Sequence, residues 1–338
     1  MSRVIRFGTG ALAELGEVAA ELGLERLLLV TTGRWAARAA ELPVAGVYAG
    51  VRPHVPVETV REAASLARSL DADGLVALGG GSAVDTCKAT TVELLPERAL
   101  RTIAVPTTYA GAEWTPFFGV TLAPGRKGGG SDERARPAAA IYDPELQLSL
   151  PLGETVGTSL NALAHCAEAY YAARHDERGD RNADCGAIAI AHALPLVVDR
   201  PDSMYARTRL LEGAMRAALA LDLAGLALAH AMAQALGGRY GLPHGSMNAL
   251  CLPPALRFNE PAVPEAIERF ARALGAPDAA ARVEELARLG GFERLRDFGV
   301  PERDLDEVAE AAAARPGARA NPRPASAPDI AALLRGIY

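Results

Sequence analysis

The sequence contains few aromatic residues and few cysteines, and it has no long apolar run. Aromatic side chains make up 5% of its 338 residues, and the four cysteines include no Cys-x-x-Cys pair. Widely spaced cysteines predict unpaired, mostly buried thiols in a reducing compartment. No apolar stretch approaches the roughly 20 residues that cross a bilayer, and the N-terminus lacks the apolar core of a signal peptide. These absences predict a cytoplasmic protein with no membrane partner.

The sequence also lacks an excess of basic residues. Its formal net charge is −6, whereas a nucleic-acid-binding protein needs a basic face. The balance therefore predicts no nucleic-acid partner. It leaves an anionic cofactor possible, because backbone N–H groups at a helix N-terminus bind phosphate even in an acidic protein.

Two regions of different character divide the chain. Residues 1–151 alternate short apolar runs with helical patterns, which predicts parallel βαβ units. The strands are expected at 27–31, 75–78 and 102–105, with a helix at 57–72. Residues 152–338 carry alanine- and leucine-rich segments at 158–173, 183–199, 204–221, 223–237, 245–258, 262–274 and 279–288. The predicted fold is an N-terminal doubly wound parallel-sheet domain (α/β) followed by an all-α domain.

Two glycine-rich segments stand out in the first region. Gly79, Gly80, Gly81 and Ser82 follow a predicted strand and precede a helical pattern. Such a turn presents N–H groups and a positive dipole end to a pyrophosphate; the alternative is a tight turn without a ligand. The segment is not the Gly-x-Gly-x-x-Gly fingerprint. The second segment, residues 125–137, predicts a mobile hairpin or flap.

Three of the six histidines occupy helix-face or helix-start positions in the second region. Asn161 and His165 stand four apart, as do His230 and Gln234, so each pair shares a helix face. Gly237-Gly238 is expected to end the second helix, and Pro243 to open the next with His244 in its first turn. Imidazole nitrogens and a short oxygen ligand suit Fe, Zn or Ni. The alternative for each histidine is a satisfied core residue.

Several motifs occur in a definite order along the chain. Gly79-Gly-Gly-Ser-Ala-Val-Asp85-Thr-Cys-Lys88 is followed by Pro106-Thr-Thr-Tyr-Ala-Gly-Ala-Glu113-Trp-Thr-Pro116. Ile141-Tyr-Asp-Pro144, Asn161-Ala-xx-His165, Leu242-Pro-His244 and Asn321-Pro-Arg-Pro324 complete the set. The ordered set resembles the iron-containing (group III) alcohol dehydrogenase family, and within it the maleylacetate reductases. The resemblance implies a dehydroquinate synthase-like fold and a homodimer.

The resemblance also implies NADH or NADPH as the cofactor. It assigns cofactor contacts to the glycine turn at residues 79–82 and to Asp85, Thr107, Thr108, His54 and Lys127. NAD-preferring relatives carry an Asp for the ribose 2′-OH where this chain has Thr32, with Arg34 nearby. Without that carboxylate a 2′-phosphate meets no repulsion, so NADPH should be accepted.

Two departures from the family concern a metal. Metal-dependent members have Asp where this chain has Asn161, and His where it has Gln234. Asn lacks the charge of a carboxylate and is a weaker ligand, so we expect no required metal. If a divalent metal binds, its ligands would be Asn161, His165, His230 and His244.

The same residues are the expected catalytic group. The resemblance implies reduction of the C=C bond of maleylacetate to give 3-oxoadipate, a step in aromatic-compound catabolism. Hydride addition to an enone develops an enolate, which His165, His230 and His244, beside Asn161, would stabilise. The cations available for a dicarboxylate substrate are Arg126, Lys127, Arg136, Arg239 and Arg323. The alternatives are an Fe- or Zn-dependent alcohol dehydrogenase or aldehyde/keto reductase, and a non-redox enzyme or binding protein on this scaffold.

Overall fold

The chain forms two compact units, residues 1–149 and 150–338, in a computed structural model. The structure describes residues 3–123 and 126–338, and the side chains of Arg126 and Lys127 lie outside that description. The expected α/β and all-α architectures are both confirmed, one in each unit.

The first unit is built on a parallel six-stranded sheet. Its strand order is β1-β8-β5-β4-β2-β3. The strands are β1 (Val4–Phe7), β2 (Leu27–Thr31), β3 (Gly46–Tyr48), β4 (Gly74–Gly79), β5 (Arg101–Pro106) and β8 (Ala139–Tyr142). The chain runs outward from β2 to β3 and then returns to the other side of β2 at β4. Ligands of such sheets bind beyond the carboxyl ends of the strands at this switch point.

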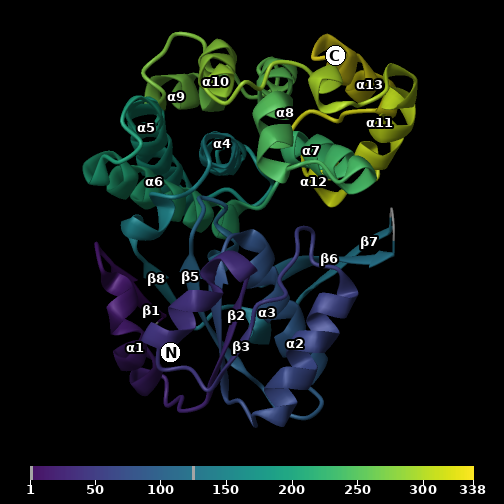
Figure 1. Cartoon of the computed structure of the whole chain (residues 1–338). Helices are drawn as coiled ribbons and strands as arrows, with labels where there is room; N and C mark the ends of the chain where they lie inside the picture. Colours follow the sequence, from purple (N-terminus) through teal and green to yellow (C-terminus); the bar gives the residue numbers. More distant parts are fainter. Residues whose placement is uncertain (1–2, 124–125) are drawn as a thin grey trace. The chain divides into compact units, whose positions relative to one another are not determined.

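Helices cover both faces of this sheet, which explains its uninterrupted apolar strands. Leu28 and Val30 pack with α2 (Val57–Ser69) and α3 (Gly81–Leu94). Leu27 and Leu29 point to the opposite face and pack with α1 (Leu15–Glu21). Figure 1 shows α1 on one side of the sheet and α2 and α3 on the other.

The glycine-rich segment after residue 125 forms part of a hairpin, as predicted. β6 (Phe117–Ala123) pairs antiparallel with β7 (Arg126–Ser131). Short 3-10 helices complete the unit: η1 (Ala11–Glu14), η2 (Gly33–Glu41), η3 (Ala112–Trp114), η4 (Glu133–Ala135) and η5 (Pro144–Gln147).

The second unit, residues 150–338, contains helices and their connecting segments and no strand, and the structure describes all of its residues. Its α-helices are α4 (Leu152–Ala169), α5 (Glu177–Asp199), α6 (Met204–Ala224), α7 (Leu228–Tyr240), α8 (His244–Asn259), α9 (Pro264–Ala273), α10 (Ala279–Arg288), α11 (Leu305–Ala313), α12 (Pro316–Arg319) and α13 (Ala327–Gly336). Two 3-10 helices are η6 (Leu295–Phe298) and η7 (Glu302–Asp304).

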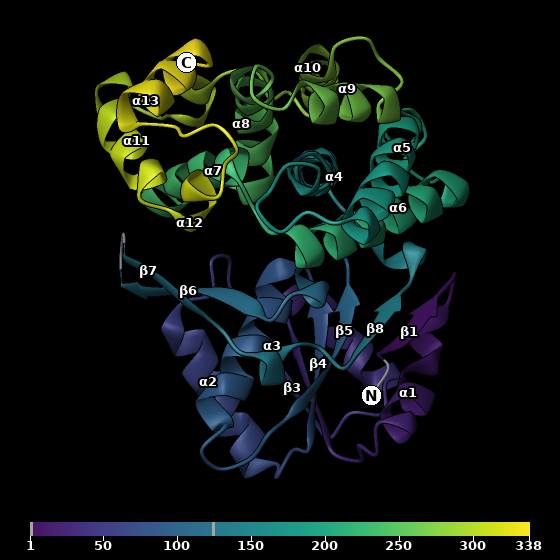
Figure 2. The same cartoon turned by 180° about the vertical axis from the view of Figure 1, so that it is seen from behind.

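Helix α4 is the core of the second unit. It packs against α5, α6, α8 and α10, and residues 159–169 are all buried. Figure 2 shows α4 nearly end-on among these helices. Polar residues of α4 are therefore enclosed by protein and must find partners there.

Three local expectations were wrong. α5 begins at Glu177, not 183, because Asp176 caps it through Gly179 N. α7 continues through Gly237-Gly238 to Tyr240, and Gly241 ends it with a left-handed φ of 66°. The apolar helical pattern around His192 predicts a core position for this residue, but His192 lies on the exposed side of α5.

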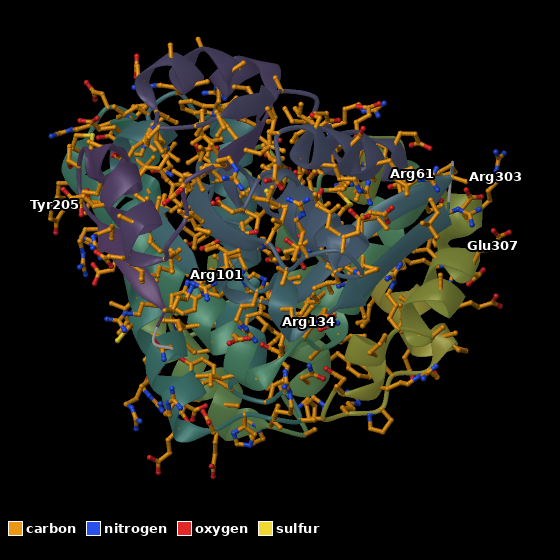
Figure 3. All side chains as sticks on the ribbon, turned by 90° about the horizontal axis from the view of Figure 1, so that it is seen from below. Arg61, Arg101, Arg134, Tyr205, Arg303 and Glu307 are labelled. Carbon is orange, nitrogen blue, oxygen red and sulfur yellow. The ribbon has the colours of Figure 1, made fainter. Side chains whose placement is uncertain are left out.

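Few large apolar side chains remain at the surface of the second unit. The most exposed is Tyr205 on α6 at 65%, whose side chain projects outward at the periphery in Figure 3. No single helix among the described residues has the length and apolarity needed to cross a membrane; only α6 and α7 together, bent by 102° at their break, pass that test.

Candidate active site

A buried polar cluster joins three helices of the second unit. α4 supplies Asn161, His165 and Glu168, α7 supplies His230, and α8 supplies His244 and Asn248. The i, i+4 spacing on α4 and on α8 turns both residues of each pair toward the same side. The structure thus brings together all four residues expected to be catalytic.

The three imidazole rings lie in contact. His165 and His230 are stacked, with ring centroids 4.8 Å apart and an interplanar angle of 11°. The rings of His230 and His244 are tilted, with centroids 5.8 Å apart. His165 and His230 are almost fully buried, at 4% and 1% exposure.

Glu168 orients His230. Its carboxylate Oε2 accepts from His230 Nδ1 at 2.7 Å and from Ala227 N at 2.6 Å, while Oε1 accepts from His230 N at 3.1 Å. A carboxylate only accepts hydrogen bonds, so His230 must carry a proton on Nδ1. Its Nε2 is then the atom left for chemistry.

A chain of amides orients His165 in a similar way. Asn248 Nδ2 donates to Asn161 Oδ1 at 2.7 Å, which turns Asn161 Nδ2 toward His165 Nε2 at 3.4 Å. Because an amide nitrogen only donates, His165 Nε2 accepts and Nδ1 carries the proton. Burial lowers the pKa of His165 well below its usual value, with smaller contributions from the neighbouring His230 and His244, so this ring is neutral.

Two ring nitrogens of the cluster have no hydrogen-bond partner. Both His165 Nδ1 and His230 Nε2 are buried and unpaired among the described residues. Buried polar atoms are almost always satisfied, so an orphan needs an explanation. A ligand that accepts from His165 Nδ1–H and meets His230 Nε2 would satisfy both.

The candidate ligand atoms do not suit a divalent metal. Asn248 Nδ2 already occupies Asn161 Oδ1 and also donates to His244 Nε2 at 3.0 Å. Glu168, the nearby carboxylate, is bound to His230 and to backbone N–H groups. Across the described residues, no three His, Cys, Asp or Glu side chains have an arrangement that could hold an ion.

The glycine turn of the first unit follows β4 and opens α3. Gly80 is the N-cap and Gly81 the first helical residue, so the N–H groups of Gly81 and Ser82 lack intrahelical acceptors. A Cβ on Gly79 would lie 2.8 Å from Ala83 Cβ, and one on Gly80 would lie 2.9 Å from Thr108 Cγ2. Only Gly81 has room for a side chain, with its nearest contact at 3.7 Å.

Other residues expected to bind the cofactor lie at the same edge of the sheet. Thr107 N donates to Gly79 O at 3.0 Å, and Thr108 packs on Gly80. His54 lies in the β3–α2 loop with a left-handed φ of 61°, and its carbonyl accepts from Thr121 Oγ1. The expected contact at Lys127 concerns a side chain outside the described part of the chain.

Asp85 and Arg34 already have partners within the protein. Asp85 accepts from Gly119 N at 3.1 Å and lies 3.5 Å from Lys88 Nζ. Arg34 donates to Ser149 Oγ and to its carbonyl. A nucleotide contact by either residue stays a prediction.

Several residues of the sequence motifs stabilise the fold through contacts within the protein. Lys88 Nζ donates to the carbonyls of Ala112 and Phe117, which ties α3 to the segment leading into β6. Asn321 exchanges two amide hydrogen bonds with Asn259 on α8. These buried contacts explain the residues without any ligand.

The comparisons with known proteins identify the family of this chain. The iron-containing alcohol dehydrogenase family matches residues 2–144, and the C-terminal part of the Fe-containing alcohol dehydrogenase family matches residues 155–338. The chain belongs to the iron-containing alcohol dehydrogenase family. The predicted family is therefore confirmed, and with it an NAD(P)H-dependent oxidoreductase.

Individual relatives cover almost the whole chain. A maleylacetate reductase of Sphingobium indicum is 39% identical over 98% of this chain and 94% of its own length. The crystal structure of maleylacetate reductase from Rhizobium sp. strain MTP-10005 is 35% identical, with a TM-score of 0.92 over 100% of this chain and 96% of that one. Sulfoacetaldehyde reductase from Bifidobacterium kashiwanohense, solved in complex with NAD⁺, is 26% identical, with a TM-score of 0.91 over 99% and 97%.

The sequence-based prediction missed Glu168 and Asn248. A signal for each was present, because Glu168 follows His165 by three residues and Asn248 follows His244 by four, which places each on its histidine's side of the helix. Their partners lie on other helices, so the spacing alone could not identify the contacts.

Proposed function

We propose that this chain reduces the C=C bond of maleylacetate with NADH or NADPH to give 3-oxoadipate. The observation that carries the proposal is the pair of unpartnered, buried nitrogens on the stacked rings of His165 and His230. The similarity to maleylacetate reductases over nearly the full length supports the substrate.

The reaction needs a hydride, a site for negative charge and a proton. NAD(P)H, when bound, supplies the hydride to the alkene carbon β to the ketone. The alkene electron pair moves to the ketone oxygen as an enolate, and a proton then adds to the α carbon. The C=C bond becomes a C–C single bond, each of its two carbons gains one hydrogen, and the ketone is restored.

The histidines supply the remaining requirements. His165 Nδ1–H donates to the enolate oxygen, and a buried donor of this kind is worth about 3–4 kcal/mol in the transition state. His230, when protonated at Nε2, delivers the proton to the α carbon, while Glu168 holds its Nδ1–H. His244 and Asn248 keep Asn161 turned so that the tautomer of His165 is maintained.

Three further properties belong to the proposal. Catalysis needs no metal, because hydrogen-bond donors take the place of a Lewis acid and two of the candidate ligand atoms, Asn161 Oδ1 and His244 Nε2, already accept from Asn248. The glycine turn with Thr107, Thr108 and His54 holds the cofactor. The enzyme is a homodimer, as its resemblance to the family suggests, and sedimentation of the purified protein tests its oligomeric state. It is also cytoplasmic, which rests on its widely spaced cysteines.

The test is NAD(P)H oxidation by the purified protein with maleylacetate, other enones, keto acids and aldehydes. Maleylacetate should give the highest kcat/KM, and replacement of His165, His230 or His244 by Ala should lower kcat by about 10² or more. His175 and His192 are both exposed, so their Ala variants are matched controls with unchanged kcat. Preference for a simple aldehyde, or normal turnover in His230→Ala, would refute the proposal.

A further inference from the structure

Arg315 contacts the face of α7 that carries His230. It is the N-cap of α12, and its guanidinium lies 3.3 Å from Gln234 Oε1 and 3.1 Å from Gln234 O. Gln234 follows His230 by four residues, so the two share a face, about 6 Å apart along the helix axis. This separation is on the order of the length of a small dicarboxylate.

Arg315 is half-buried, and among the described residues its side-chain contacts are to Gln234 and not to a carboxylate. Its Nε is buried and unpaired, and burial lowers the pKa of its guanidinium. A partly buried cation without an anion is unfavourable. The arrangement is therefore incomplete without an anionic group.

Three of the arginines expected to serve a dicarboxylate are engaged elsewhere, and the side chain of the fourth, Arg126, lies outside the described part of the chain. Arg239 pairs with Glu307 at 2.7 Å and Asp304 at 3.4 Å. Arg136 pairs with Glu133 at 2.8 Å, and Arg323 donates to Phe258 O. Arg315 differs from Arg239 and Arg136 because its contacts with Gln234 are to neutral oxygens, and from Arg323 because its Nε is buried without a partner.

We infer that Arg315 binds a carboxylate of the substrate and that Gln234 positions its guanidinium for this. The inference rests on the proposed reduction of an oxo-dicarboxylate. The neutral amide oxygen of Gln234 orients the cation without cancelling its charge. A guanidinium can then pair with a carboxylate through two N–H bonds, which selects a dicarboxylate enone over one with a single carboxylate.

Arg315→Met tests the inference, assayed with maleylacetate and with its two monoamides, each of which lacks one charged carboxylate. Loss of a charge-assisted hydrogen bond should lower kcat/KM for maleylacetate by about 10–100-fold, mainly through KM. One monoamide should be unaffected by the substitution, because it lacks the carboxylate that Arg315 binds. Arg303→Met is the control, since Arg303 is 87% exposed and projects outward in Figure 3.

Two further variants separate binding from folding. Arg315→Lys should recover part of the affinity, since it keeps the charge but not the paired geometry. Gln234→Leu should raise KM while leaving kcat near normal. If Arg315→Met does not fold, the test uses wild type and Arg315→Lys, with inhibition by a saturated dicarboxylate and by its monoamides measured in both. The wild type should bind the dicarboxylate more tightly than the monoamides, and this preference should be weaker in Arg315→Lys.

Equal losses for maleylacetate and both monoamides, or an inhibitor preference that Arg315→Lys leaves unchanged, would overturn the inference. Either result would make Arg315 a structural link between α7 and α12. Failure of the proposed function looks different, because wild-type protein would then not reduce maleylacetate at all.

Discussion

Replacing Glu168 with Gln should impair turnover far more than stability. Glu168 is fully buried and accepts three hydrogen bonds, from Ala227 N, His230 N and His230 Nδ1. Glutamine has one accepting oxygen. If that oxygen takes the place of Oε2, it keeps two of the bonds, and the amide NH₂ then faces His230 N–H.

The structural cost is one unsatisfied backbone donor, about 1–3 kcal/mol. For a unit of this size the melting temperature should fall by several degrees, at roughly 2–4 °C per kcal/mol. The effect on turnover should exceed the effect on stability. An amide holds the His230 ring less firmly than a carboxylate does, and the amide NH₂ of the substituted side chain can turn toward His230 Nδ1. Removing the group that orients a histidine typically costs about 10–100-fold in activity.

The assay is steady-state NAD(P)H oxidation at saturating substrate, together with cofactor titration and thermal melting. Glu154→Gln is the matched control, because Glu154 lies on the same helix and is exposed. Cofactor affinity should be unchanged in Glu168→Gln, since the proposed phosphate-binding turn belongs to the other unit. Normal kcat in a folded Glu168→Gln protein would refute the role of Glu168 in orienting His230.

Three other predictions concern the cofactor, metal and pH. Gly81→Val should abolish NAD(P)H binding in a folded protein, because position 81 alone in the turn has room for a Cβ; unchanged affinity by titration would remove the turn from the site. A strong chelator should leave activity intact, whereas loss of activity that Fe or Zn restores would refute the metal-free mechanism. Because the pKa of His165 is lowered in the folded state, the unfolded state gains a proton as pH falls below about 6.5, and the free energy of unfolding should drop by up to about 1.4 kcal/mol per pH unit. The slope of unfolding free energy against pH gives the number of protons taken up on unfolding. In His165→Gln this number, measured by chemical denaturation at several pH values, should be smaller by one; an unchanged slope would assign the titration to another group.

Local patterns were enough to predict three of the six strands in the parallel sheet of the first unit. The apolar runs of β2, β4 and β5 are buried on both faces and therefore contain little but Leu, Val, Ile and Ala. Strands β1, β3 and β8 are three or four residues long. Such short segments carry too little periodicity to be recognised.

The sequence by itself determined the family, the two fold classes, the glycine turn and the shared helix faces of Asn161 with His165 and His230 with Gln234. These features depend on residues within a few positions of one another, whose spacing is set by helix and strand geometry. The tertiary structure alone decided the partners. Glu168 meets His230 across 62 positions, Asn161 meets Asn248 across 87, and Gln234 meets Arg315 across 81. Contacts over such distances arise only when packing of the apolar helix faces brings separate helices together, and that packing gave the histidines their tautomers and Arg315 its place beside α7.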